Sequence, residues 1–332
     1  MNKLSVNVGA VLLLAILLIM GCKTNNTVGP ESERPPDGVT SEQSAMQQLA
    51  LQDGFVQNDE QTFDDDAVEL MDYETLGLYK PISEITPLRF GRFIDSITTR
   101  VLITAQPGDS TAIALVTKNI FGKFKIKALS STGDTLPIIQ KPFHDISTRN
   151  ILFKRVNRSV ELYWKNWIPV ASSLVDGGTV SPNNHIDITR VEMFLPNGDT
   201  VTVTEPNNQY LLYRWIWTFR RWHDIRMDVP ELNIGDRVRI RVTIQSDQSD
   251  TDFVALRLGF DRFHKKRVRL TFISERPIGG NTFERVFETS WAIHPRLGLF
   301  HAGVDAMTKG TVRDDTAPYS VNWWGVPFRV HP

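Results

Sequence analysis

The sequence DRVRIRVTI, at residues 236–244, alternates charged or polar residues with branched apolar residues from Arg237 onward. Successive side chains of a β-strand point to opposite faces, so the pattern places Arg237, Arg239 and Arg241 on one face and the apolar residues on the other. The segment is therefore predicted to be a strand in a sheet that has one buried and one exposed face.

Two later segments, FVALRLGF (residues 253–260) and RVRLTF (residues 267–272), show the same alternation. Their arginines alternate with Val, Leu and Phe, as expected for further half-buried strands. If the three segments are neighbouring antiparallel strands, one sheet face carries six arginines, which we call the arginine face. Its members are Arg237, Arg239, Arg241, Arg257, Arg267 and Arg269.

Three pairs of β-branched or aromatic runs are joined by short turns that contain Gly-Asp, at residues 108–109, 133–134 and 198–199. Glycine tolerates a positive φ angle, and aspartate can bond to its own backbone, so both residues favour tight turns. Paired runs with such connections indicate β-hairpins. The chain is therefore predicted to be all-β, an antiparallel β-sandwich of immunoglobulin-like style in one or two units, with a short N-terminal helical segment.

The first residues are organised like those of an exported protein. Lys3 supplies a positive charge, and residues 8–20 form an uncharged apolar run. A membrane-spanning helix needs about 20 apolar residues, so this shorter run is predicted to be the apolar part of a signal peptide. The run is followed closely by Cys22, the single cysteine of the chain.

The sequence Ile19-Met20-Gly21-Cys22 resembles the lipobox of bacterial lipoproteins, although Met20 stands where that family usually has a small residue. The resemblance covers the first 22 residues. It implies that residues 1–21 are a signal peptide that is removed, and that Cys22 then carries acyl chains. Several chains are needed, because a single acyl chain holds a protein at a membrane only marginally.

Lys23 follows the cysteine, where lipoproteins retained in the inner membrane have Asp. The resemblance therefore implies an outer-membrane lipoprotein, anchored on either the periplasmic or the external face. With no second cysteine, the chain cannot form an internal disulfide bond. Its stability is therefore expected to come from burial of apolar side chains.

Composition divides the mature chain into segments. Residues 22–44 are rich in Pro, Gly, Ser, Thr, Asn and Glu and are predicted to be a disordered tether. Residues 45–80 are predicted to be an acidic, partly helical leader, with Thr40 in a capping-box position before the helix. The remainder is predicted to comprise a β-hairpin unit, residues 81–145, and a β-sandwich unit, residues 146–332.

The net charge of −1 conceals a separation of charge along the chain. Residues 23–80 contain thirteen acidic and three basic residues, whereas residues 81–332 contain 25 acidic and 33 basic residues. Two interpretations are open. The acidic part can lie over the basic surface or be solvated, or the basic body can meet an anionic partner.

The arginine face is the first candidate binding surface. Guanidinium groups bind phosphates, sulfates and carboxylates through paired hydrogen bonds, so lipopolysaccharide or an anionic glycan is a candidate ligand. Alternatively, the arginines solubilise the sheet and pair with Glu284 and Glu288 of a later strand. A nucleic-acid partner is not expected for an exported, tethered protein, although residues 263–267 are basic.

The second candidate is YLLYRWIWTFRRWHD, residues 210–224, the densest aromatic segment of the chain. A row of rings can stack on the faces of sugars, or it can fill the core of a sandwich. The side chains selected as candidate ligand contacts come from the middle of the segment. They are Trp215, Trp217, Arg220, Arg221 and Trp222.

Catalytic and metal-binding patterns are weak in this sequence. Acidic turns at residues 246–252 and 314–315 could hold Ca²⁺, but they are also ordinary turn sequences, and no metal site is predicted. The histidines have no metal-ligand spacing, and the nucleophile-elbow, P-loop and dinucleotide-binding motifs are absent from the sequence. No cofactor is predicted. A carboxylate pair for glycoside hydrolysis depends on the fold and cannot be read from sequence.

The sequence therefore predicts a lipid-anchored binding or structural module of the cell envelope, and it does not show whether a protein partner exists. One alternative is a glycan-active hydrolase with an unidentified carboxylate pair, and another is an assembly subunit that pairs through a strand edge. A closed sandwich with buried tryptophans would favour the module. Facing carboxylates beside exposed tryptophans would favour the hydrolase.

Overall fold

The computed structural model describes much of the chain after residue 40. The described residues are 41–58, 68–69, 85–105, 109–158, 165–215, 225–227, 229–258, 266–293, 296–300 and 302–332. Cys22 and almost all of the predicted tether lie outside them. The described residues belong to one compact unit, Val39–Pro332, and confirm an all-β sandwich with a short N-terminal helix.

The largest sheet has twelve strands among the described residues. Its main path runs β1-β2-β3-β4-β6-β19-β18-β13-β14, and β5, β9 and β10 form a branch. The strands are β1 (Val68–Glu69), β2 (Thr86–Thr104), β3 (Thr111–Leu129), β4 (Ile139–Arg155), β5 (Trp167–Ser173), β6 (Asp176–Thr179), β9 (Tyr210–Trp215), β10 (Ile225–Met227), β13 (Phe253–Leu258), β14 (Lys266–Arg269), β18 (Gly303–Met307) and β19 (Val321–Gly325).

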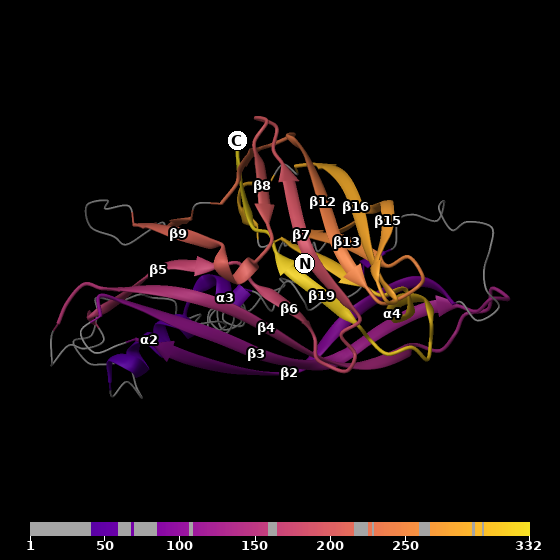
Figure 1. Ribbon diagram of the computed structural model, residues 1–332, viewed down its shortest axis with the longest axis horizontal. Coiled ribbons are helices and arrows are strands. Elements are labelled where there is room, and N and C mark those ends of the chain that lie inside the picture. Colours follow the sequence, from indigo (N-terminus) through magenta and orange to yellow (C-terminus); the bar gives the residue numbers. More distant parts are fainter. Residues whose placement is uncertain are drawn as a thin grey trace, which may run out of the picture. The chain divides into compact units, whose positions relative to one another are not determined.

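A second sheet has five strands in the order β15-β16-β12-β7-β8, all antiparallel. A small third sheet has the order β11-β20-β17. Figure 1 shows the five strands side by side above the long strands β2, β3 and β4. The bounds are β7 (Ile186–Phe194), β8 (Thr200–Val203), β11 (Glu231–Asn233), β12 (Arg237–Ser246), β15 (Thr271–Gly279), β16 (Thr282–Ala292), β17 (Gly298–Phe300) and β20 (Phe328–His331).

The predicted alternation of β12 is confirmed. Val238, Ile240, Val242 and Ile244 are 0 % exposed, and the arginines between them point away from the core. These side chains pack in one apolar cluster with residues from β13 and β18 of the large sheet. We call this cluster the sandwich core, because it lies between the two sheets.

β13 and β18 also contribute to a second cluster, which we call the inner core. There Phe253 and Met307 pack with Phe90 of β2 and Phe124 of β3. All six residues of β13 are buried, because one face of the strand points into each core. The large sheet therefore curls until its long strands cover the far face of β13 and β18.

The N-terminal helix covers one end of the long strands. α2 (Glu42–Leu51) is followed by α3 (Gly54–Asn58), and Ser41 caps α2 through a capping box with Ser44. The cap is thus Ser41 and not Thr40 as predicted, and helical structure begins inside the segment predicted to be a tether. Glu42 ties α2 to the sheet by accepting hydrogen bonds from Arg155, Asn166 and Trp167 at 2.7–3.3 Å.

The predicted hairpins form as β2–β3, β3–β4 and β7–β8. Gly133 and Gly198 occupy their turns with φ of +92°, a backbone conformation that glycine adopts more readily than other residues. The predicted boundary between residues 145 and 146 falls inside β4, which is hydrogen-bonded along its length. Two further helical segments among the described residues are η3 (Pro206–Asn208) and α4 (Lys309–Arg313).

Candidate functional site

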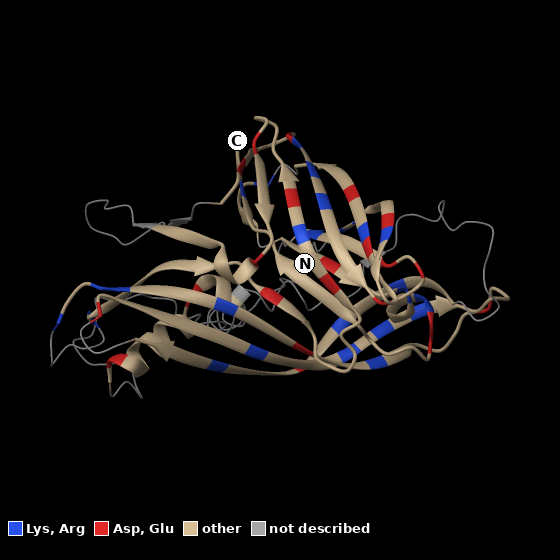
Figure 2. Ribbon diagram, viewed as in Figure 1, with Lys and Arg blue, Asp and Glu red and all other residues tan. Residues whose placement is uncertain are grey.

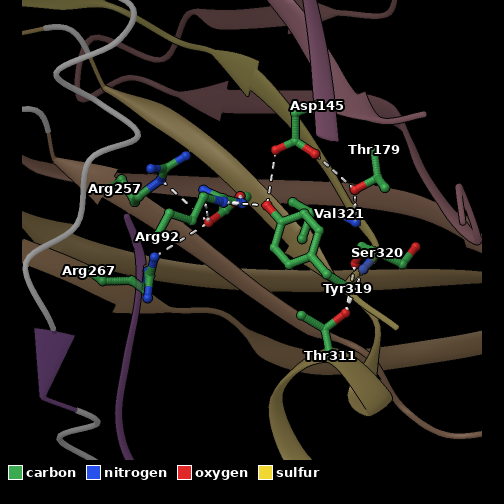
Figure 3. Close-up of polar contacts among 10 residues, drawn as sticks. Arg92, Asp145, Thr179, Arg257, Arg267, Thr311, Tyr319, Ser320 and Val321 are labelled. Atoms are coloured by element: carbon green, nitrogen blue, oxygen red, sulfur yellow. Dashed lines mark hydrogen bonds and ion pairs between the residues drawn. The ribbon is translucent and has the colours of Figure 1, made fainter. Parts of the chain in front are cut away.

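The inner core contains a group of polar and charged side chains that we call the buried charge cluster (Figure 3). Six strands and the loop before β19 contribute to it, and no member is more than 9 % exposed. Its members are Arg92 (β2), Asp145 (β4), Thr179 (the last residue of β6), Arg257 (β13), Arg267 (β14), Asp305 (β18) and Tyr319 (loop).

Asp305 is the centre of this cluster. Its Oδ1 lies 2.7 Å from Nη2 of Arg92, and its Oδ2 lies 3.4 Å from Nε of Arg257 and 3.6 Å from Nη2 of Arg267. Burial alone would raise the pKa of Asp305, but the charges of the three arginines outweigh burial and hold that pKa below its ordinary value. Asp305 is therefore an ionised carboxylate that is shared by guanidinium groups from three strands.

A hydrogen-bonded chain joins the same arginine to a second carboxylate. Nε of Arg92 donates to the Tyr319 hydroxyl, which donates to Oδ2 of Asp145 at 3.0 Å. Oδ1 of Asp145 accepts from the hydroxyl of Thr179 at 3.0 Å, and that hydroxyl accepts from the backbone N–H of Val321. Burial raises the pKa of Asp145 to about 6, although Arg92, Thr179 and Tyr319 favour its ionised form.

The buried charge cluster has a structural role. Its members are enclosed by the inner core, and the guanidinium of Arg267 lies 4.8 Å from the centre of the Phe90 ring. Removing one partner of a buried pair leaves an uncompensated charge, so such pairs oppose alternative packings more than they add net stability. We interpret the cluster as the device that fixes how β2 and β4 dock on β13 and β18.

The raised pKa of Asp145 gives a testable pH dependence. The folded protein binds this proton more tightly than the unfolded chain, whose carboxyl has the ordinary pKa of 3.8. Stability from this group is present below the unfolded pKa and is lost as pH rises through the folded pKa, a total of about 3 kcal/mol. Urea unfolding of the mature protein should show this decline between about pH 4 and pH 7, relative to Asp145→Asn. Parallel pH profiles for the two proteins would contradict the assignment.

The predicted arginine face does not form, because its members belong to different sheets. Arg237, Arg239 and Arg241 lie on β12 of the five-stranded sheet, whereas the other three lie on β13 and β14 of the large sheet. Arg257 and Arg267 point into the inner core, where they pair with Asp305. The guanidinium of Arg269 lies 5.4 Å from the ring of Phe253. The prediction was wrong because it assumed that consecutive strands pair.

The three arginines of β12 form a row on the outer face of the five-stranded sheet, in which Arg237 and Arg239 are exposed and Arg241 is half-buried. Arg239 and Arg241 lie 3.5 Å and 2.9 Å from the carboxylate of Glu288 on β16, and both pack on the ring of Phe194. Figure 2 shows acidic and basic positions beside one another on β7, β12 and β16. The alternative interpretation, with cross-strand glutamate partners, is thus confirmed for Glu288, whereas Glu284 pairs with Arg276 at 2.6 Å.

The aromatic segment lies partly within the described residues, as β9. Tyr213 is 6 % exposed, and its hydroxyl donates to Asp53, so this ring belongs to the core. The backbone of Trp215 pairs with Ile225 of β10. The Trp215 side chain lies outside the described part of the structure. The same holds for the whole of four other candidate residues, Trp217, Arg220, Arg221 and Trp222.

Every tryptophan whose side chain the structure describes is buried. Exposed fractions are 2 % for Trp167, 7 % for Trp291, 2 % for Trp323 and 4 % for Trp324. Trp323 packs directly on the backbone of β6, because a Cβ atom added to Gly177 would lie 2.2 Å from the indole ring. These rings fill the cores and provide no face on which a sugar could stack.

The acidic turn at residues 246–252 is held by other side chains of the protein. Asp252 accepts from Nη1 of Arg285 at 2.5 Å, and Asp247 lies 2.8 Å from Nδ1 of His185. In the other turn, Asp314 accepts from the backbone N–H groups of Thr316 and Ala317, as a turn former does. Over the described ranges, no group of three or more His, Cys, Asp and Glu residues is arranged to hold a metal ion.

One pair of carboxylates bears on the hydrolase alternative. Burial raises the pKa values of Asp176 on β6 and Asp187 on β7, and the charge of Asp187 further raises the pKa of Asp176. The side chain of Trp324 donates a hydrogen bond to Asp176. Because Trp324 is buried, its ring lies beside the pair without forming a sugar-stacking surface.

A cavity of about 320 Å³ opens at the β8 edge of the five-stranded sheet, where β7, β8, β9 and the segments before β11 and β20 meet. Eleven described residues line it, of which ten are Val, Leu, Met or Pro and the eleventh is Gln209. The sequence predicted a strand that contains Val201 and Val203. The cavity beside these two side chains depends on the opposite layer and was not predicted.

No protein-family model matches this chain, and no curated protein is significantly similar to it. Within the part of the chain that the structure describes, no helix has the length and apolar character needed to cross a membrane.

Proposed function

We propose that the chain is an outer-membrane lipoprotein, anchored through acyl chains on Cys22, whose β-structured body is a ligand-binding module of the cell envelope. The observation that carries the proposal of binding is the cavity at the β8 edge. Protein interiors are packed as densely as organic crystals, and their voids rarely exceed a water molecule. A lined space of about 320 Å³ lies within the range of ligand sites.

The buried tryptophans favour this function over the hydrolase. A glycan-active site would be expected to combine facing carboxylates with accessible rings. The described tryptophan side chains are instead buried in the cores, and Asp145 and Asp305 are paired within the buried charge cluster.

The experiment that tests the proposed function measures thermal unfolding of the mature protein in the presence of envelope extracts. A ligand that binds only the native state raises the midpoint temperature according to its concentration and affinity. We expect a saturable increase with either the aqueous or the organic-solvent extract of bacterial envelopes. Unchanged midpoints in both extracts would contradict a ligand-binding module.

The arginine row of β12 provides a second contact surface for an anionic envelope component such as lipopolysaccharide. We expect the affinity of the mature protein for lipopolysaccharide to fall as salt is added, and to fall by up to about fivefold in Arg239→Ala, because exposed ion pairs contribute at most about 1 kcal/mol. Arg276→Ala serves as the matched control, because Arg276 lies on the edge strand β15 of the same sheet and pairs with Glu284 of β16. If Arg239→Ala binds lipopolysaccharide with wild-type affinity and without dependence on salt, the arginine row of β12 is not the contact surface.

A further inference from the structure

The cavity at the β8 edge has a graded exposure from its mouth to its floor. Val201, Gln209 and Pro230 are half-buried, whereas Val191 and Val203 are at most 3 % exposed. The cavity therefore leads from the surface into the sandwich core. Its polar group, Gln209, lies with the half-buried residues at the mouth.

The cavity is present because the edge of the sheet is short and lined by small side chains. β8 has four residues, and its inward residues Val201 and Val203 lie directly opposite Met193 and Val191 of β7. Packed layers are about 10 Å apart, and valine reaches less far across such a gap than leucine or phenylalanine. The layer opposite ends in the prolines Pro230 and Pro327, whose rings cannot extend to fill it.

The lining selects among classes of ligand. Among the residues that the structure describes, the lining contains no charged side chain to hold a phosphate or carboxylate, and no aromatic side chain on which a sugar or nucleobase could stack. A cavity of 150 Å³ lined by aliphatic and aromatic residues accommodates benzene, so a cavity about twice as large can accommodate roughly ten to twelve carbon atoms. Aliphatic walls of valine, leucine and methionine suit a saturated chain.

We propose that this cavity binds a single saturated aliphatic chain, with the polar end of the ligand at Gln209. The amide of Gln209 can both donate and accept a hydrogen bond, as a carboxyl or ester group requires. The inference rests on the proposed function and specifies the chemistry of its ligand. A free fatty acid and the acyl chain of a phospholipid share this chemistry.

The test uses the mature chain from residue 22 onward with Cys22→Ala, so that neither its own acyl chains nor detergent occupies the cavity. Binding of 11-(dansylamino)undecanoic acid is followed by fluorescence, and dodecanoic acid is the competitor. In a second arm, the protein is incubated with phosphatidylethanolamine and phosphatidylglycerol vesicles, separated from them, and analysed for bound lipid by mass spectrometry. Binding in the first arm alone identifies a fatty acid, and lipid recovered in the second identifies a phospholipid.

Val201→Trp places a large ring in the mouth, and Thr202→Trp places the same ring on the opposite, exposed face of β8. Each excluded methylene group lowers affinity about fourfold, so Val201→Trp should weaken binding about tenfold or more while Thr202→Trp leaves it unchanged. Gln209→Trp, with Asn208→Trp as its exposed neighbour, repeats the comparison from the other side of the mouth. Thermal unfolding verifies that each variant is folded.

If both Val201→Trp and Gln209→Trp bind the dansyl fatty acid with wild-type affinity, the cavity is not the binding site. Absence of saturable binding in both arms would overturn the aliphatic ligand. Neither result would remove the proposed function if envelope extracts still raised the unfolding temperature, because the module would then bind a different component or bind it elsewhere.

Discussion

Asp305→Ala should lower the free energy of unfolding of the mature protein by about 3–5 kcal/mol, because it leaves buried arginines without their shared carboxylate. Asp305 is 0 % exposed, and its partners Arg92, Arg257 and Arg267 are at most 9 % exposed. Water cannot replace the lost interaction at such positions. The loss is a large part of the stability of a typical domain, which is about 5–15 kcal/mol. The measurement is urea unfolding followed by circular dichroism.

Glu288→Ala is the matched control for this substitution. Glu288 also pairs with two arginines, but those arginines are 45 % and 38 % exposed in their side chains. Exposed pairs contribute about 0–1 kcal/mol, so this variant should remain close to wild type. If Asp305→Ala does not fold, Asp305→Asn provides an intermediate case that keeps the shape of the side chain. Equal effects of Asp305→Ala and Glu288→Ala would contradict the role assigned to the buried charge cluster.

Cys22→Ala should abolish retention of the protein in the membrane fraction. Each buried methylene group of an acyl chain contributes about 0.8 kcal/mol of membrane affinity, and the proposed anchor depends entirely on chains attached to this sulfur. Fractionation of cells and intact-mass analysis of the protein provide the measurement. The wild-type mass should exceed that of the chain from residue 22 by the mass of the acyl groups.

Thr24→Ala, two residues further along the chain, is the control for Cys22→Ala. It changes the same segment without removing the sulfur, so it should leave membrane retention intact. An unmodified thiol in wild-type protein, or undiminished membrane retention of Cys22→Ala, would end the proposal of a lipid anchor.

The sequence was sufficient to predict the local structure of the body. Period-two alternation in β12 and turn chemistry at Gly133 and Gly198 depend on neighbouring residues only, so the strands and hairpins were predicted correctly. The start of the helix was displaced by one residue, because Ser41 can cap a helix as well as Thr40 can.

The pairing of strands was not predictable in the same way. β12 and β13 are close in sequence, yet β12 pairs with β7 and β16, while β13 pairs with β14 and β18. These partners are chosen by packing of distant segments. Arg257 and Arg267 therefore appeared to belong on an exposed face. The signal that was available was Asp305, an acidic residue inside the apolar run AGVDAM, which requires a buried cationic partner.

The cavity could not have been predicted, because its size depends on the distance between two layers. Alternation identified the inward side of β8, but it did not show that Pro230 and Pro327 lie opposite. The five candidate contacts between Trp215 and Trp222 likewise remain predictions about side chains outside the described part of the structure.

The position of β13 and β18 between the two cores has a consequence for how the body unfolds. Each of these strands presents alternate residues to opposite interiors, so neither interior is complete without them. Separating the long strands from the sandwich would expose apolar surface and break the buried ion pairs on the long strands and on the sandwich at the same time. The two halves of the body therefore share one cooperative transition, and a fragment ending near residue 145 would lack the layer against which its long strands pack.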